Sequence, residues 1–125
     1  MISLNIFRHA DAVDFPAGQT IFNAGEPGDT MYIIKEGAIE IRSGETVFEV
    51  AGPGSVVGEM ALIDKSPRSA SAIARSDCKL VVVDRRRFEF LVSQTPYFSL
   101  EVMQIMAERL RHVNALLAQS KAATK

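Results

Sequence analysis

Residues 57–74, with the sequence VGEMALIDKSPRSASAIA, contain the groups of this chain that are best suited to bind a small ligand. Gly58 has no Cβ atom, so the oxygen atoms of a ligand can approach the backbone closely. The N–H groups of Met60, Ala61 and Leu62 begin a predicted helical turn and point outward from it. Because N–H groups at a helix start attract negative charge, this segment is predicted to cradle an anion.

Two charged side chains of the same segment match the two polar parts of a nucleotide. Arg68 follows Pro67, and a guanidinium can hold a phosphate through two parallel hydrogen bonds and its positive charge. A singly charged phosphodiester is balanced in this way without a metal ion. Glu59 can accept a hydrogen bond from a sugar hydroxyl, as the acidic residue of dinucleotide sites does. Together these groups fit a cyclic nucleotide; the plainer alternative is a surface ion pair between Arg68 and Glu59.

The segment resembles the phosphate-binding cassette of the cyclic nucleotide-binding domain family. Residues 21–37 are similar to the second signature of that family, a glycine-acid turn followed by four apolar residues and a closing glycine. The two signatures stand in the family's order, and the resemblance covers about residues 10–118. It implies a regulatory domain that binds a 3′,5′-cyclic nucleotide and signals to a protein effector through its C-terminal helix. The ligand-binding residues expected from it are Val57, Gly58, Glu59, Met60, Ala61, Leu62, Arg68, Ser69 and Ala70.

The resemblance also bears on the choice of nucleotide and on the packing behind the cassette. Ser69 carries a hydroxyl directly after the arginine, which can donate to the phosphate or, when the base is in the syn orientation, to guanine. The same residue type occurs in family members selective for cyclic AMP, so cyclic AMP is expected rather than cyclic GMP. Two residues depart from the family pattern: Val57 stands where phenylalanine is frequent, and Phe22 stands where a smaller apolar residue is frequent. We expect altered packing there but no loss of a polar ligand contact.

The composition indicates one compact domain. The chain has 125 residues, of which 47% are hydrophobic, and its net charge of -1 gives no overall basic character for binding nucleic acid or an anionic membrane. No apolar run approaches the roughly 18 residues of a membrane span, and the N-terminus lacks the basic region of a signal peptide. A cytoplasmic location is therefore expected. The single cysteine, Cys78, precedes an apolar run and is predicted to be a buried thiol.

The order of turn residues and apolar residues predicts strands first and helices last. All eight glycines lie between positions 18 and 58, and residues 25–29 are expected to form only a turn. Eight short antiparallel strands fit a jelly roll. The predicted architecture is a mainly β domain over residues 1–125, with a β-roll over about residues 12–83 and C-terminal helices over about residues 85–93 and 96–119. The strands are expected near residues 12–15, 20–23, 31–35, 38–42, 46–50, 55–57, 69–75 and 78–83.

Local signals predict where several elements begin and end. A hairpin turn is expected at Ser43-Gly44, and residues 120–125 are expected to be a frayed end. The expected helix starts are Ser3 as the N-cap of a short helix over residues 4–10, Asp84 as the second N-cap, and Thr95 as the third with Pro96 in the first helical position.

The last helix carries an apolar stripe of two heptads. Its members are Met103, Met106, Leu110, Val113 and Leu117, at spacings of 3, 4, 3 and 4. We consider two partners for the stripe: the β-roll of the same chain, which it would cover as a lid over the ligand, and the same helix of a second protomer in a homodimer. The family resemblance implies that this helix contacts the base of the nucleotide near Val113 and Asn114.

Other functions are weighed on the residues that they would require. A metal site or a metal-dependent jelly-roll enzyme would need a ligand cluster, whereas His9 and His112 are far apart in the sequence, so neither a metal nor catalytic residues are predicted. The arginines at positions 85–87 are expected to be a solvated helix start. The sequence lacks the DNA-binding segment that follows this helix in the family's transcription factors, so a nucleic-acid partner is not expected. The remaining alternative is a ligand-free β-roll that serves as an interaction scaffold.

Overall fold

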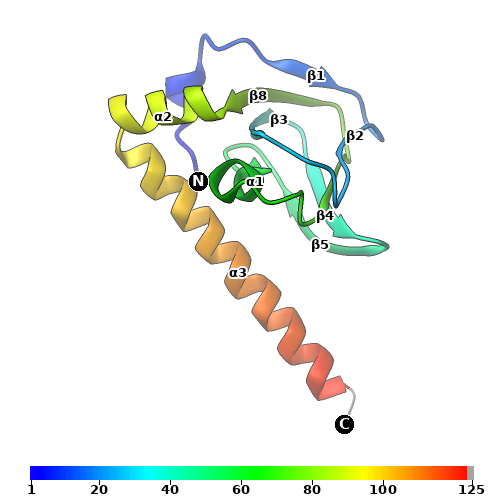
Figure 1. The fold of residues 1–125 in the computed structure, drawn as a ribbon. Coiled ribbons are helices and arrows are strands. Elements are labelled where there is room, and N and C mark those ends of the chain that lie inside the picture. The colour runs from blue at the N-terminus through cyan, green and yellow to red at the C-terminus, as the bar shows by residue number, and fades with distance from the viewer. Residues whose placement is uncertain (124–125) are drawn as a thin grey trace.

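Eight strands form two antiparallel four-stranded sheets that face each other as a β-roll (Figure 1). The computed structural model describes residues 1–123. One sheet has the strand order β1-β8-β3-β6 and the other β2-β7-β4-β5, which confirms the predicted jelly roll. The strands are β1 (Val13–Phe15), β2 (Thr20–Phe22), β3 (Thr30–Glu36), β4 (Ile39–Ser43), β5 (Thr46–Ala51), β6 (Val56–Val57), β7 (Ser71–Ala74) and β8 (Cys78–Asp84).

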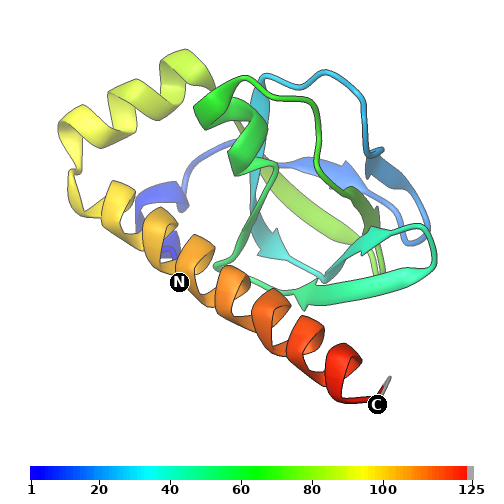
Figure 2. The same ribbon diagram turned by 60° about the horizontal axis from the view of Figure 1, so that its bottom comes forward.

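Helices lie before, within and after the roll. A 3₁₀ helix (η1, Leu4–Phe7) begins the chain, and the short helix α1 (Glu59–Asp64) connects β6 to β7. Two helices follow the last strand, α2 (Arg85–Gln94) and α3 (Tyr97–Ala123). Figure 2 shows that α3 runs along one side of the roll, past the strands of the second sheet. Within the described residues, no helix combines the length and the apolar character needed to cross a bilayer.

The predicted N-cap of α2 is confirmed, and four finer predictions were wrong. The Asp84 carboxylate accepts a hydrogen bond from the Arg87 N–H at 2.8 Å. The hairpin loop is Gly44–Glu45 rather than Ser43-Gly44, because the β4–β5 ladder extends to the pair Ser43 and Thr46.

The other three corrections concern helix ends. The first helix spans only residues 4–7, and the side chain of Ser3 makes no capping hydrogen bond. The backbone N–H of Ser3 donates to the Glu101 carboxylate at 3.0 Å. Pro96 lies directly before the first helical residue, Tyr97, and not at it. The last helix continues to Ala123, so the expected frayed end was wrong for residues 120–123, and residues 124–125 lie outside the described part.

Two apolar clusters make up the core. One lies inside the roll and includes Ile34, Ile39 and Leu80, with Cys78 buried beside them as predicted. The other joins the first sheet to the helices, and Phe98 of α3 lies at its centre between the rings of Phe7 and Phe88, at centroid distances of 6.2 and 5.7 Å. The start of α3 is therefore fixed against the roll by aromatic packing.

The face of α3 that packs on the roll is not the predicted stripe. Phe98, Val102 and Ile105 are buried on that face, whereas Met103, Leu110 and Leu117 of the stripe are exposed, and Met106 and Val113 are half-buried. Of the two partners considered for the stripe, the roll of the same chain therefore accounts for the half-buried Met106 and Val113, which line a cavity against the roll, and not for the whole stripe. The buried residues begin at the aromatic anchor Phe98, and this anchor sets the rotation of the helix.

The two phenylalanines Phe98 and Phe90 provide a matched test of this anchor. Phe98 is 0% exposed and Phe90, on α2, is 62% exposed. We expect Phe98→Ala to lower the free energy of unfolding by about 3 to 5 kcal/mol, because it leaves a cavity between helices and sheet. Phe90→Ala should change it by about 0.5 kcal/mol or less, as surface substitutions do. Urea unfolding followed by circular dichroism measures both, and equal losses would contradict the proposed anchor.

Candidate ligand-binding site

The turn between β6 and α1 requires the glycine that the sequence places there. Gly58 has a φ angle of 82°, in the left-handed region, at the N-cap position of α1. A Cβ atom on it would lie 2.5 Å from Nη1 of Arg68 and 3.1 Å from the carbonyl oxygen of Thr30. Gly58 therefore serves both the backbone conformation and the close approach of an arginine.

The guanidinium of Arg68 is held inside the protein and not at its surface. Arg68 is 7% exposed, and its Nη1 donates to the carbonyl oxygens of Thr30 and Gly58 at 2.8 and 3.0 Å. Its Nη2 donates to Thr30 Oγ1 at 3.3 Å. The Cζ atom lies 4.2 Å from the ring centroid of Phe22, and a Cβ atom on Gly28 would lie 2.2 Å from Nε. Arg68 thus occupies a slot between an aromatic face and a glycine.

This slot explains one departure from the family pattern and corrects one expectation. Phe22 supplies the face on which the guanidinium stacks, a favourable arrangement because the ring face is negative. Gly28 lies in the segment that was expected to form only a turn, yet the guanidinium passes so close to it that no side chain would fit.

Arg68 has no carboxylate to balance its charge within the part of the chain that the structure describes, since none of the ion pairs there includes it. The alternative of a surface ion pair between Arg68 and Glu59 was therefore wrong. A small cavity of about 60 Å³ adjoins the guanidinium, and we call it the small cavity. It is lined by Phe22, Ile41, Val57, Gly58, Glu59, Met60, Ala61, Arg68, Ser69, Ala70 and Arg109.

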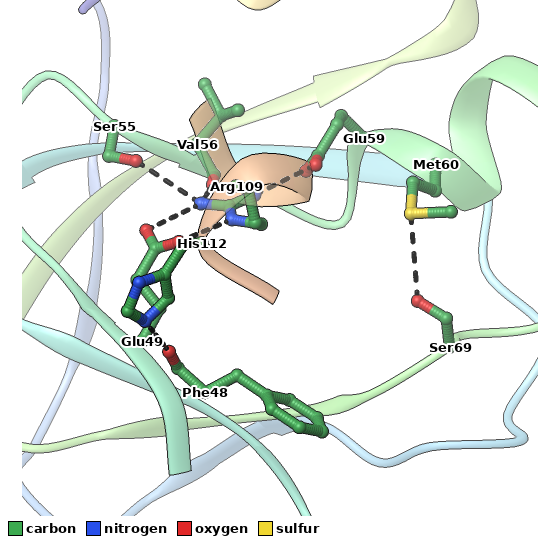
Figure 3. A network of polar contacts seen from close by, with 9 residues as sticks. All are labelled: Phe48, Glu49, Ser55, Val56, Glu59, Met60, Ser69, Arg109 and His112. Carbon is green, nitrogen blue, oxygen red and sulfur yellow. Dashed lines mark hydrogen bonds and ion pairs between the residues drawn. The ribbon is translucent and has the colours of Figure 1, made fainter. Parts of the chain in front are cut away.

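Glu59 is paired with an arginine of the last helix. Its carboxylate is 3% exposed, and Oε1 accepts a hydrogen bond from Arg109 Nη1 at 2.9 Å. Arg109 also donates to both oxygens of Glu49 on β5, from Nε at 2.8 Å and from Nη2 at 3.0 Å. The backbone oxygen of Val56 accepts a further bond from Nη2 at 2.9 Å (Figure 3). One guanidinium therefore joins α3 to β5, to β6 and to the start of α1.

The charge of Arg109 is stable in this position. Burial disfavours the charged form, but the hydrogen bond to Glu49 and the negative charges of Glu59 and Glu49 outweigh it and raise the pKa of Arg109 above its usual value. No role for Arg109 or Glu49 was predicted from the sequence. A signal was present, because Arg109 continues the spacing of Phe98, Val102 and Ile105 on the packed face of α3. A charged residue in that row requires a buried partner.

A second cavity, of about 410 Å³, lies between α3, α1 and the second sheet, and we call it the large cavity. Its apolar walls include Ile41, Phe48, Met60, Met106, Ala107, Leu110 and Val113, and its polar groups are Glu49, Glu59, Ser69, Arg109 and His112. His112 Nε2 donates to the backbone oxygen of Phe48 at 2.7 Å, which is a second link between α3 and β5 (Figure 3).

Nearly all of the predicted site residues meet around these two cavities, with two exceptions. Val113, for which a contact with the base is expected, lines the large cavity. Asn114, predicted beside it, is exposed and lines neither cavity, because the next residue of a helix points about 100° away. Leu62 packs in the core and lines neither cavity, so only its backbone N–H, at the start of α1, could serve a ligand.

The structure predicts that Arg109 is essential for stability, whereas Arg111 on the same helix is not. We expect Arg109→Met to lower the free energy of unfolding by about 3 to 5 kcal/mol, because it leaves Glu59 buried without its partner. Arg111, which is exposed, is the matched control, and Arg111→Met should change it by about 0.5 kcal/mol or less. A double variant with Glu59→Gln should recover part of the loss in urea unfolding. Equal stability of the two single variants would contradict a buried ion pair.

Comparison with known proteins places this arrangement among nucleotide-binding domains. Residues 12–95 match the family model of the cyclic nucleotide-binding domain. The chain is 35% identical over 116 residues to the CRP-like cAMP-activated global transcriptional regulator of Mycobacterium tuberculosis, covering 89% of this chain and 52% of that protein. It is 38% identical over 88 residues to the cAMP-dependent protein kinase regulatory subunit of Aspergillus fumigatus, covering 66% of this chain and 20% of that protein.

The fold is also similar to that of a solved structure. The crystal structure of the catabolite activator protein of Thermus thermophilus superposes with a TM-score of 0.76 and 28% identity, covering 89% of this chain and 55% of that one. This chain thus spans about half the length of these bacterial relatives. With the family model matched from the first strand to the end of α2 and both signatures folded around one site, this chain belongs to the cyclic nucleotide-binding domain family.

Proposed function

We propose that this chain binds one 3′,5′-cyclic nucleotide, cyclic AMP in preference to cyclic GMP, and acts as a sensor without catalysing a reaction. The observation that carries the proposal is the buried guanidinium of Arg68, which has no carboxylate within the described chain. A buried charge is costly unless it is paired. A phosphodiester with one negative charge supplies that pair without a metal ion.

The phosphate would occupy the small cavity. Arginine has five N–H donors, and three contacts of Arg68 go to Thr30 and Gly58, so two donors remain for phosphate oxygens. The backbone N–H groups at the start of α1 supply further donors, as helix starts do for anions. Glu59, held in place by Arg109, would accept a hydrogen bond from the ribose 2′-hydroxyl.

The base would occupy the large cavity. Its apolar walls, among them Ile41, Met106 and Val113, suit the faces of a purine ring. The preference for cyclic AMP is supported by the names of the relatives, which are described as cAMP-activated and cAMP-dependent.

A ligand in this position would affect α3 through contacts that already exist. Glu59 would contact the ribose and is bonded to Arg109 of α3, and Met106 and Val113 of α3 line the base cavity. The ligand can shift α3 only to the extent that it binds one arrangement of the helix more tightly than another. The output would pass to a protein effector.

The exposed stripe of α3 is the proposed seam of a homodimer. Met103, Leu110 and Leu117 are exposed and follow one another at intervals of seven residues, which is the repeat of a helix that packs against its own copy. Two heptads make a weak coiled coil in isolation, so the rolls on either side would have to support it.

The phosphate contact can be tested by comparing Arg68, which is buried beside the small cavity, with Arg75, which is exposed. We expect Arg68→Leu to weaken the binding of cyclic AMP about a hundredfold or more in titration calorimetry, because it removes the charge-assisted hydrogen bonds to the phosphate. Arg75 has a 57% exposed side chain and pairs with Glu40 at 3.7 Å, so Arg75→Leu should bind like the unaltered protein. An unchanged dissociation constant for Arg68→Leu would refute the site. Absence of binding by the unaltered protein would favour the ligand-free scaffold.

The dimer seam calls for a separate measurement of mass. In sedimentation equilibrium the unaltered chain should be a dimer at micromolar concentration, and the double variant Met103→Lys/Leu117→Lys should be a monomer, because it places like charges opposite each other in the seam. Gln104→Lys, an exposed site next to the stripe, adds the same charge and should leave the dimer intact. A monomeric unaltered chain would rule out the seam.

A further inference from the structure

Met60 is the methionine that borders both cavities of the site. It lies in the first turn of α1 and lines both the small cavity and the large cavity. It is 45% exposed, so peroxide in solution can approach this side chain without unfolding of the domain.

Among residues 1–123 the sulfur of Met60 accepts a single, weak hydrogen bond. The hydroxyl of Ser69 donates to Sδ at 3.8 Å across the mouth of the site, where Figure 3 shows the two side chains facing each other. A thioether is a poor acceptor, so this hydroxyl is readily given up to a ligand.

Oxidation would change the polarity of the Met60 side chain and its strength as a hydrogen-bond acceptor. Hydrogen peroxide transfers one oxygen atom to a thioether: the O–O bond breaks, an S–O bond forms, sulfur loses two electrons and water leaves. The product, methionine sulfoxide, is polar and is reduced back by sulfoxide reductases. Its oxygen is a strong acceptor, placed within reach of the Ser69 hydroxyl and carrying partial negative charge beside the space for the phosphate.

We propose that Met60 is a reversible oxidation site that closes the nucleotide site when peroxide converts it to the sulfoxide. This inference rests on the proposed function. The sulfoxide oxygen holds the Ser69 hydroxyl, repels the phosphate oxygens and places a polar group against the apolar walls of the large cavity. Each effect opposes the bound nucleotide and leaves the core of the fold untouched.

The other four methionines are buried, lie away from the two cavities, or line only one of them, so the loss of affinity on oxidation is expected to depend on Met60. Met31 is 0% exposed in the core, and Met1 and Met103 are exposed but line neither cavity. Met106 lines the large cavity from α3 but is half-buried and does not border the small cavity.

The test compares cyclic AMP binding before and after oxidation of the same protein. The full chain is treated with hydrogen peroxide, the oxidised methionines are located by peptide mass spectrometry, and the dissociation constant is measured by titration calorimetry. We expect sulfoxide at Met60 to weaken binding about tenfold or more, since a lost hydrogen bond to a charged group has this size. Treatment with methionine sulfoxide reductases should restore the original value.

Two variants assign the effect to one sulfur, each compared with its own untreated form. Met60→Leu keeps the apolar volume and should bind equally before and after peroxide, whereas Met103→Leu should lose affinity as the unaltered chain does. The inference is overturned if Met60 stays reduced while other methionines oxidise, if sulfoxide at Met60 leaves the affinity unchanged, or if Met60→Leu is still inactivated. Failure of the untreated chain to bind cyclic AMP would instead overturn the proposed function, and the inference with it.

Discussion

The guanidinium of Arg68 lies in the interior of this domain and forms no ion pair with a carboxylate of residues 1–123, and the rest of the site is arranged around that charge. Removing an unpaired charge from water is costly, and here backbone oxygens of Thr30 and Gly58 and the ring of Phe22 compensate only in part. The guanidinium fits because glycine occupies positions 28 and 58, where a Cβ atom would come within 2.5 Å of it or closer. An anion in the adjoining small cavity would complete the balance.

Arg109, in contrast to Arg68, is paired with carboxylates. Two carboxylates, Glu49 and Glu59, balance its charge, and it joins the last helix to the roll. The two arginines therefore have different roles. Arg109 keeps Glu59 in place and couples α3 to the cassette, and Arg68 remains available to a ligand. Glu59 is bonded to Arg109 and also lines the small cavity. A ligand that contacts Glu59 therefore acts on the same network that holds α3.

The elements set by short-range signals could be predicted from the sequence. The eight strands, the Asp84 cap and the Gly-Glu turn depend on neighbours within a few residues, and each is present. The contacts of Arg109 could not be predicted in the same way, because Glu59 and Glu49 lie 50 and 60 residues away in the chain. The slot for Arg68 likewise combines Phe22 and Gly28 with a distant residue. The stripe on α3 was identified, but periodicity alone does not say which apolar face meets the roll, and the aromatic contacts of Phe98 decide it.

The most direct test of the account observes the Arg68 guanidinium itself during ligand binding. In nitrogen-labelled protein, the Nε–H resonance of Arg68 can be assigned with the variant Arg68→Lys and followed as cyclic AMP is added. If Arg68 binds the phosphate, this resonance should show a saturable shift that is complete at one equivalent, and a much smaller shift with adenosine, which lacks the phosphate. An Arg68 resonance that ignores cyclic AMP, or that moves equally with adenosine, would contradict the claim that this buried charge is the phosphate receptor.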